Sequence, residues 1–185
     1  MTAKIKFTVI GAGHGGKAMA AHHSLQGFHT TLFNRTPEHV AAIKELGGID
    51  LAMPETGQRS FCRLAKTTSN IAEALESADM VMVVVPSSAH GDIANLCAPH
   101  LKDGQVVVLH PGRTCGAIEF AKVLRDMNCQ ADVTIAEAET FIYASRSDGP
   151  AEARIFRIKD AVPVAALPAN RNHMVLDMIH KAYPQ

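Results

Sequence analysis

The chain of 185 residues is long enough for one domain with a single sizeable core, because 47% of its residues are hydrophobic. Its 18 Lys and Arg residues balance its 18 Asp and Glu residues and are scattered, which argues against binding to nucleic acid or to an anionic membrane. The longest apolar run, residues 80–86, is too short to span a bilayer, and no hydrophobic signal segment precedes residue 11, so we expect a cytoplasmic protein.

An apolar strand over residues 5–10 runs directly into the glycine turn Gly11-Ala12-Gly13-His14-Gly15-Gly16, which opens a helix over residues 17–26. In a G-x-G-x-x-G turn the first glycine permits the bend, the second lets the backbone approach a phosphate, and the third lets the helix pack on the strand. A second strand over residues 30–33 completes a βαβ unit. The pattern predicts a dinucleotide site at the start of this helix, and we assign all six residues of the turn to it.

The end of the second strand predicts which dinucleotide is bound. Folds that bind NAD have Asp or Glu there, on the ribose 2′-hydroxyl, whereas this chain has Asn34. The amide removes a carboxylate that would repel a 2′-phosphate, and Arg35 and Thr36 supply a cation and a hydroxyl that hold one. We therefore expect NADP(H) to be favoured over NAD(H). Thr36 is also the expected N-cap of a helix over residues 36–46.

The middle of the chain alternates strands with helices. Residues 49–69 predict a hairpin excursion, Asn70 is a helix cap, and the apolar run at residues 80–85 is typical of a parallel strand covered on both faces. The alternation continues with a helix over 89–98, a strand over 106–109, a helix over 117–127 and a strand over 133–136. This order predicts an α/β fold with a doubly wound, mainly parallel Rossmann sheet.

Loops that leave the strands of such a sheet border the ligand. Val85 and Pro86 follow one strand and are expected to support the nicotinamide or its ribose, while Ser87 offers a hydroxyl or caps the next helix. Pro111 stiffens the next strand exit and is assigned to the cofactor site as well.

The remaining titratable groups point to no metal and no catalysis. His14 and His110 are expected near the cofactor without a catalytic role, and the adjacent His22 and His23 point to different faces of a helix. The cysteines form no C-x-x-C pair, which predicts reduced thiols in the core or in loops. They are Cys62, Cys97, Cys115 and Cys129.

Beyond residue 137 the alternation gives way to strands. Residues 140–147, 154–159 and 162–167 predict a C-terminal β extension of the sheet, and Arg146 is a candidate partner for a substrate carboxylate. A terminal helix follows over residues 172–183. Its apolar positions fall at helical spacing, at Met174, Val175, Met178, Ile179 and Ala182.

Four motifs together resemble the opine (octopine/nopaline) dehydrogenases over almost the whole chain. They are the glycine turn, Val-Pro-Ser-Ser-Ala-His at 85–90, His-Pro-Gly-Arg-Thr-Cys-Gly-Ala-Ile-Glu-Phe at 110–120 and Ala-Glu-Thr-Phe-Ile-Tyr-Ala-Ser-Arg at 138–146. The resemblance implies an NAD(P)-dependent oxidoreductase that couples an amino acid to a 2-oxo acid, with the cofactor reducing their imine.

The resemblance also implies a division of labour between two domains. Residues 1–168 would form the NAD(P)-binding domain, and residues 169–185 would begin a linker helix to a helical catalytic domain that this chain lacks. We therefore assign no catalytic residue within the chain. On the cofactor side, the resemblance implies that Gly116, Glu119 and Thr140 contact the oxo acid.

Two alternatives remain open. The chain is also compatible with the cofactor domain of a dehydrogenase of the glycerol-3-phosphate or ketopantoate type, whose helical domain would likewise be missing. A third hypothesis is a free-standing NADP(H)-binding sensor without turnover, with a homodimer formed through the terminal helix. An apolar stripe left exposed on that helix would promote such dimers.

Overall fold

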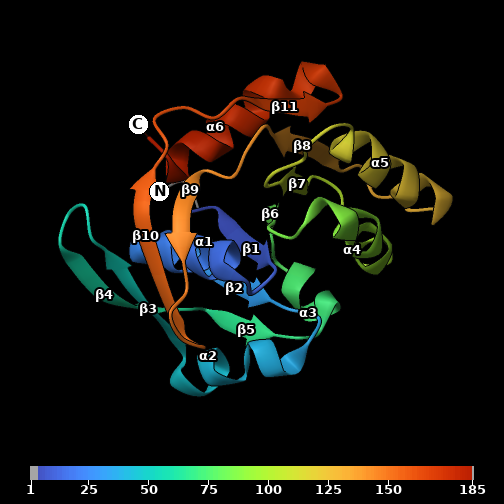
Figure 1. The fold of residues 1–185 in the computed structure, drawn as a ribbon. Helices are drawn as coiled ribbons and strands as arrows, with labels where there is room; N and C mark the ends of the chain where they lie inside the picture. Colours follow the sequence, from blue (N-terminus) through green and yellow to red (C-terminus); the bar gives the residue numbers. More distant parts are fainter. Residues whose placement is uncertain (1–3, 185) are drawn as a thin grey trace.

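The computed structural model describes residues 4–184, which form two β-sheets and their helices (Figure 1). The main sheet has seven strands within these residues, and all but β11 run parallel. In spatial order the strands are β5 (Lys66–Thr68), β2 (His29–Phe33), β1 (Lys6–Ile10), β6 (Met80–Val83), β7 (Val106–Leu109), β8 (Thr134–Ala138) and β11 (Val164–Leu167). The predicted doubly wound sheet is thus confirmed, with its strand order reversing between β1 and β6.

Helices cover both faces of this sheet. The face toward one core carries α3 (Ile71–Leu75), α4 (His90–Cys97) and α5 (Gly116–Asp126). The opposite face carries α1 (His14–Leu25), α2 (Ala41–Leu46) and α6 (Asn172–Ala182). As predicted, the Asn70 side chain caps α3 by accepting hydrogen bonds from the amides of Ala72 and Glu73. None of the helices in residues 4–184 has the length and apolar character needed to cross a membrane.

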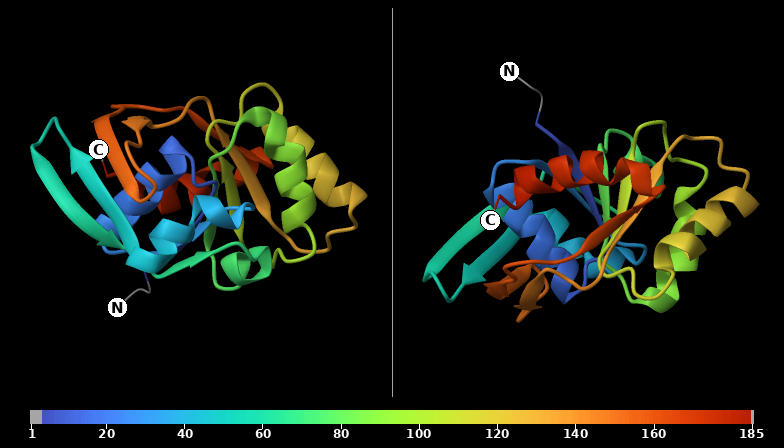
Figure 2. Two further views of the ribbon diagram at one scale, coloured as in Figure 1. Left: turned by 60° about the horizontal axis from the view of Figure 1, so that its bottom comes forward. Right: turned by 90° about the horizontal axis from the view of Figure 1, so that it is seen from above.

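A second sheet lies beyond α1 and is built from strands far apart in the sequence. Its order is β4 (Gln58–Arg63), β3 (Gly48–Met53), β10 (Glu152–Ile158) and β9 (Tyr143–Arg146). Since α1 contacts both sheets, it is sandwiched between them (Figure 2). Every residue of α1 from 16 to 23 is buried, which explains why this helix is rich in alanine and has no polar face.

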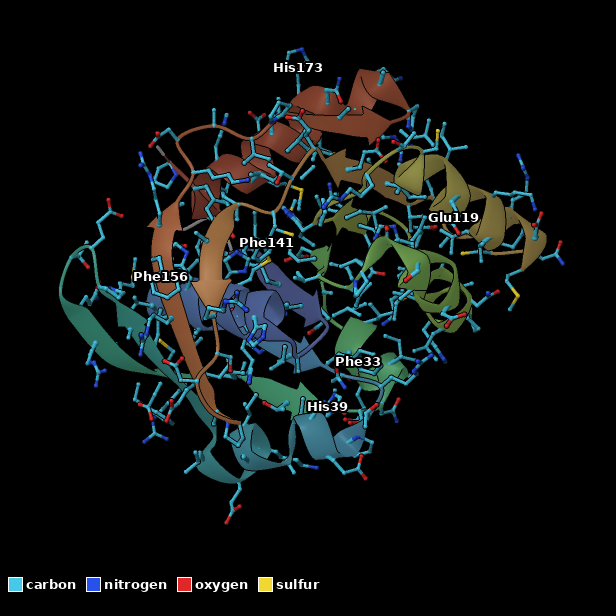
Figure 3. The ribbon with its side chains drawn as sticks, in the orientation of Figure 1. Phe33, His39, Glu119, Phe141, Phe156 and His173 are labelled. Carbon is cyan, nitrogen blue, oxygen red and sulfur yellow. The ribbon has the colours of Figure 1, made fainter. Side chains whose placement is uncertain are left out.

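The expected β extension is therefore only partly right. β11 does extend the main sheet, where it pairs antiparallel with β8. In contrast, β9 and β10 leave that sheet and join the hairpin of β3 and β4, with β10 parallel to β3. The strand expected over residues 140–147 is confined to β9. Phe141 precedes it (Figure 3), and its ring lies so close to Gly15 that a Cβ there would be 2.9 Å away.

The terminal helix belongs to the folded core, so the apolar stripe considered as a dimer surface is mostly buried. Val175 is 1% exposed and Ile179 is 8% exposed, and both pack in the same core as α1. Among the five apolar positions of this stripe, only Met174 is well exposed, at 41%. The helix covers the main sheet beside α1, and the homodimer stays a prediction. Gln185, the last residue of the segment expected to begin a linker, lies outside the described residues.

Two predicted helix starts also differ. The helix expected over residues 36–46 divides into a 3-10 turn, η1 (Pro37–His39), and α2, and the Thr36 side chain makes no capping bond. Likewise a 3-10 turn, η2 (Ser87–Ala89), precedes α4, and neither has a side-chain cap. At both places a short 3-10 turn, and not a capping side chain, precedes the α-helix.

A buried chain of hydrogen bonds fastens the end of α6 and β9 to α1. His22 Nδ1 lies 2.9 Å from Tyr143 Oη, the two tyrosine oxygens are 2.7 Å apart, and His23 Nε2 lies 2.7 Å from Tyr183 Oη. Each link has one donor and one acceptor when both imidazoles are neutral. Burial favours that state, because it lowers the pKa of His22 to about 4 and that of His23 well below its ordinary value.

Candidate functional site: the ligand edge of the main sheet

The glycine turn has the geometry that its sequence predicts. Gly11 has φ +108°, and a Cβ there would lie 2.3 Å from the carbonyl oxygen of Val84. A Cβ at Gly16 would lie 1.7 Å from the carbonyl oxygen of Gly11, so only glycine lets α1 pack this closely. A Cβ at Gly13 would meet nothing within 4 Å. The unpaired amides of the first turn of α1 border this open side, as a pyrophosphate site requires.

Asn34 has a second role that the sequence did not reveal. Its Oδ1 accepts a hydrogen bond from the amide of Ala12 at 3.0 Å, while its Nδ2 donates to the carbonyl oxygen of Thr36 at 3.1 Å. The side chain therefore holds the glycine turn against the end of β2. No carboxylate takes this position, which keeps the neighbourhood of Arg35 open to an anion.

The structure brings the predicted residues at the ends of β2 and β6 into one cavity of about 170 Å³. Arg35 forms an ion pair of 3.5 Å with Asp92 across it, but the two side chains are 69% and 67% exposed. A pair so exposed contributes little and leaves the guanidinium free to turn toward a ligand. The predicted residues that line the cavity are Gly11, Asn34, Arg35, Thr36, Val85 and Pro86. The other predicted residues lie outside its wall, namely Ala12, Gly13, His14, Gly15, Gly16, Ser87 and Pro111.

The glycine turn is also anchored to the second sheet. His14 Nδ1 accepts a hydrogen bond from the amide of Ser147 at 3.0 Å. Lys17 Nζ donates to the carbonyl oxygens of Gly149 and Pro150 at 2.9 and 3.2 Å. Burial lowers the pKa of Lys17, against an opposing effect of the Glu152 carboxylate. The His14 side chain is thus engaged away from the cofactor groove, which leaves its backbone amide for the phosphates.

The four residues assigned to the substrate lie in three places. Thr140 follows β8, and its Oγ1 accepts a hydrogen bond from Lys159 Nζ at 2.8 Å. Arg146 is exposed at the end of β9. Gly116 and Glu119 lie in the first turn of α5.

The N-terminus of α5 already has an anionic partner. Glu137 Oε2 accepts a hydrogen bond from the amide of Ala117 at 2.7 Å, and a Cβ at Gly112 would lie 2.2 Å from the Cβ of Glu137. The carboxylate therefore offsets the positive end of the helix where an oxo acid was expected to bind. The sequence signal for this partner was the glutamate at the end of the sixth parallel strand.

Residues 4–184 contain no group of three or more His, Cys, Asp or Glu side chains that could hold a metal ion. All four cysteines are free thiols; Cys62 and Cys97 are buried, Cys129 is half-buried and Cys115 is exposed. Burial raises the pKa of the Cys97 thiol to about 12, which keeps it protonated and unreactive.

Comparison with known proteins agrees with this site. A family model described as the NAD binding domain of 6-phosphogluconate dehydrogenase matches residues 6–128. An opine dehydrogenase from Arthrobacter sp. (strain 1C) is 34% identical over 97% of this chain and 49% of its own length. A glycerol-3-phosphate dehydrogenase [NAD(P)+] from Haemophilus influenzae is 33% identical over 55% of this chain and 30% of its own. The chain thus spans about half or less of the length of these curated relatives.

Solved structures share the fold. An octopine dehydrogenase with NADH and L-arginine superposes with a TM-score of 0.81 and 20% identity, over 98% of this chain and 47% of that one. A yersinopine dehydrogenase with NADP+ superposes with a TM-score of 0.81 and 16% identity, over 98% of this chain and 46% of that one. A ketopantoate reductase of the PanE/ApbA family from Ralstonia eutropha superposes with a TM-score of 0.70 and 21% identity, over 96% of this chain and 54% of that one. The match to opine dehydrogenase along almost the whole chain confirms the resemblance that the four motifs indicated.

Proposed function

Since the chain belongs to the family of NAD binding domains of 6-phosphogluconate dehydrogenase, we propose that it is the cofactor half of an oxidoreductase that reductively condenses an amino acid with a 2-oxo acid. The observation that carries this proposal is the extent of the likeness. The family model ends at residue 128, whereas the likeness to opine dehydrogenase covers 97% of the chain. It therefore includes β9, β10 and α6, which a generic dinucleotide domain does not need.

In the proposed reaction the cofactor, when bound, supplies the hydride. The chain's own residues bind and orient it. The glycine turn holds the pyrophosphate, and Asn34 keeps that turn against β2. Val85 and Pro86 support the ribose or nicotinamide at the end of β6. Ser87 and Pro111 are assigned to the outer margin of the same site.

We propose that the oxo acid lies near Thr140, whose hydroxyl is positioned by Lys159. Gly116, Glu119 and Arg146 are further candidates for contacts to the two carboxylates of the product. In this proposal the general base comes from a helical domain that follows in the full-length enzyme, by analogy with the relatives' greater length. The proposed enzyme is cytoplasmic, in keeping with four free thiols, and its homodimer stays a prediction for a light-scattering measurement.

The test of this function is an assay for oxidation of reduced cofactor with pyruvate and a panel of amino acids. We expect the present chain to bind cofactor without turnover, and the same chain joined to its following coding sequence to be active. Turnover by the present chain alone would contradict the proposed origin of the base. Activity on glycerol 3-phosphate in place of amino acids would favour the alternative suggested by the relative from Haemophilus influenzae.

We further propose that NADP(H) is favoured over NAD(H). Support comes from the Asn34 amide at the end of β2 and from Arg35, whose only ion pair within residues 4–184 is long and exposed. A charge-assisted contact to a 2′-phosphate predicts that NADPH binds roughly tenfold or more tightly than NADH.

Fluorescence titration with both cofactors measures this preference. Arg35→Ala is expected to weaken NADPH binding and leave NADH binding nearly unchanged, whereas Asn34→Asp keeps an acceptor for the Ala12 amide and shifts the preference toward NADH. Arg125→Ala, on α5, is the matched control for loss of an arginine. If Arg35→Ala weakens both cofactors equally, the guanidinium does not read the 2′-phosphate.

A further inference from the structure

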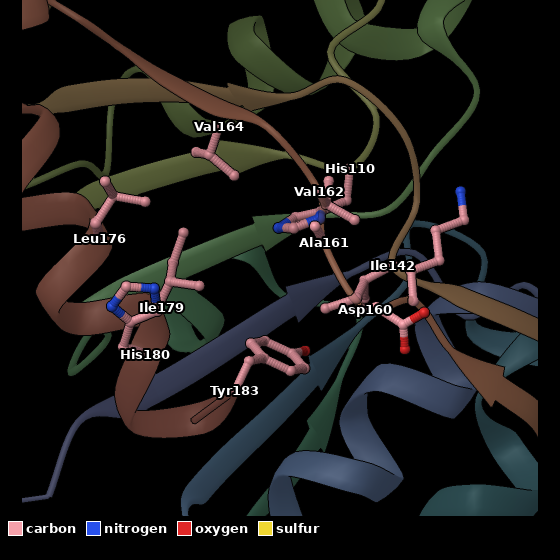
Figure 4. Close-up of a pocket in the computed structure, with 11 residues that line it drawn as sticks. His110, Ile142, Asp160, Ala161, Val162, Val164, Leu176, Ile179, His180 and Tyr183 are labelled. Carbon is pink, nitrogen blue, oxygen red and sulfur yellow. The ribbon is translucent and has the colours of Figure 1, made fainter. Parts of the chain in front are cut away.

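A cavity of about 210 Å³ lies between α6, the connection from β10 to β11, and the end of β7 (Figure 4). This is the volume of roughly seven water molecules, which suits a small metabolite. Most of its wall is apolar. The apolar side chains are those of Ile142, Ala161, Val162, Val164, Leu176 and Ile179.

His110 is the polar side chain in this wall that has no partner. It is 4% exposed, and neither ring nitrogen makes a hydrogen bond within the described residues. Figure 4 shows His110, Ile179 and Tyr183 among the side chains that line the cavity. The Tyr183 hydroxyl is already used in the chain to His23 and Tyr143. A buried imidazole with two free nitrogens can accept a water or a ligand atom as its hydrogen-bond partner.

The charges around the cavity favour an anion. Lys159 lines it, and the single hydrogen bond of its ammonium to Thr140 leaves two N–H donors. Asp160 also lines it, but that carboxylate accepts from Arg157 at 3.2 Å and its side chain is 87% exposed. His180 is an exposed residue of α6 at the same cavity. Lys159 is therefore the half-buried charge beside the apolar wall, whereas the Asp160 carboxylate lies in solvent.

We propose that this cavity is a binding site for a short-chain aliphatic carboxylate, whose oxygens pair with His110 and Lys159 and whose carbon chain packs against α6. A neutral imidazole supplies one N–H donor, and burial keeps it neutral by lowering the pKa of His110 to about 4. The cavity and the groove at the ends of β2 and β6 have no lining residue in common. The inference shares Lys159 with the proposed oxo-acid site and stands otherwise on the cavity and on His110.

The test uses three probes with the same carbon chain, namely butyrate, n-butylammonium and 1-butanol. Each is titrated into the 185-residue chain without cofactor, while the ring nitrogens of all histidines are followed by NMR. We expect saturable shifts of the His110 nitrogens with butyrate only, at concentrations up to about 50 mM. An equal response to all three probes would mean an adventitious additive only. Absence of any saturable shift with butyrate would overturn the proposal.

Variants separate this site from general anion binding. Lys159→Met is expected to weaken butyrate binding roughly tenfold or more, since it removes a charged donor. Ala161→Leu fills the cavity from an exposed loop position and should abolish the His110 shifts with the fold intact. Lys122→Met removes an exposed lysine on α5 and should change nothing. Unaltered butyrate binding in both Lys159→Met and Ala161→Leu would refute the site.

Discussion

Acid is expected to unfold this domain through its buried histidines. Burial lowers the pKa of His22 from 6.5 to about 4 and does the same to His110. The unfolded chain then binds more protons than the folded one between these pH values. Stability is therefore complete above pH 6.5 and is lost as the pH falls toward 4. Each of the two histidines contributes about 1.4 kcal/mol per pH unit to the loss of stability. Between pH 6.5 and 4 this amounts to about 3 kcal/mol for each histidine.

The assay is urea denaturation followed by circular dichroism at pH 8, 6.5, 5.5 and 4.5. His22→Gln removes one titrating group, and the slope of unfolding free energy against pH should fall by about 1.4 kcal/mol per unit. His173→Gln, at an exposed position near the start of α6, controls for loss of a histidine. The reasoning is refuted if His22→Gln and the unmodified chain have the same slope, or if stability rises on acidification.

Further predictions concern the glycine turn, α6 and the thiols. Gly16→Ala places a Cβ 1.7 Å from a carbonyl oxygen and should cost about 1–3 kcal/mol in urea denaturation, whereas Gly13→Ala should keep the stability and lose dinucleotide affinity in a fluorescence titration. Ile179→Ala should cost about 2–5 kcal/mol; a change near zero would mean that α6 is not part of the core. In thiol labelling followed by mass spectrometry, exposed Cys115 should react first and Cys97 last, and the reverse order would contradict the burial described.

Local signals explain what the sequence predicted well. The strand, glycine turn and helix at residues 5–26 are adjacent in the chain, and the apolar run at 80–85 carries its own evidence of burial on both faces. The hydrophobic pattern and the glycine conformations that produce these elements involve residues close together in the sequence. The same holds for Asn70, whose cap depends on amides two and three residues away.

Long-range pairing explains what the sequence did not predict. Buried and more exposed residues alternate over the first half of β10, as in any half-buried strand, and nothing in that pattern identifies β3 as its partner. The hydrogen bond between Asn34 and the Ala12 amide likewise joins residues 22 positions apart. Nothing in the sequence marks Lys159, because its place beside Thr140 depends on a contact between residues 19 positions apart.

The α1 helix between two sheets has a consequence for how the chain folds during synthesis. β3 leaves the ribosome early, but its parallel partner β10 is made only near the end of the chain, where Asp50 pairs with Glu152. Until then only β3 and β4 of the second sheet cover α1, and β3 keeps an open edge, which is the kind of surface that aggregates. A nascent chain paused between β3 and β10 would thus hold α1 against half of the second sheet, and would be most dependent on chaperones at that stage.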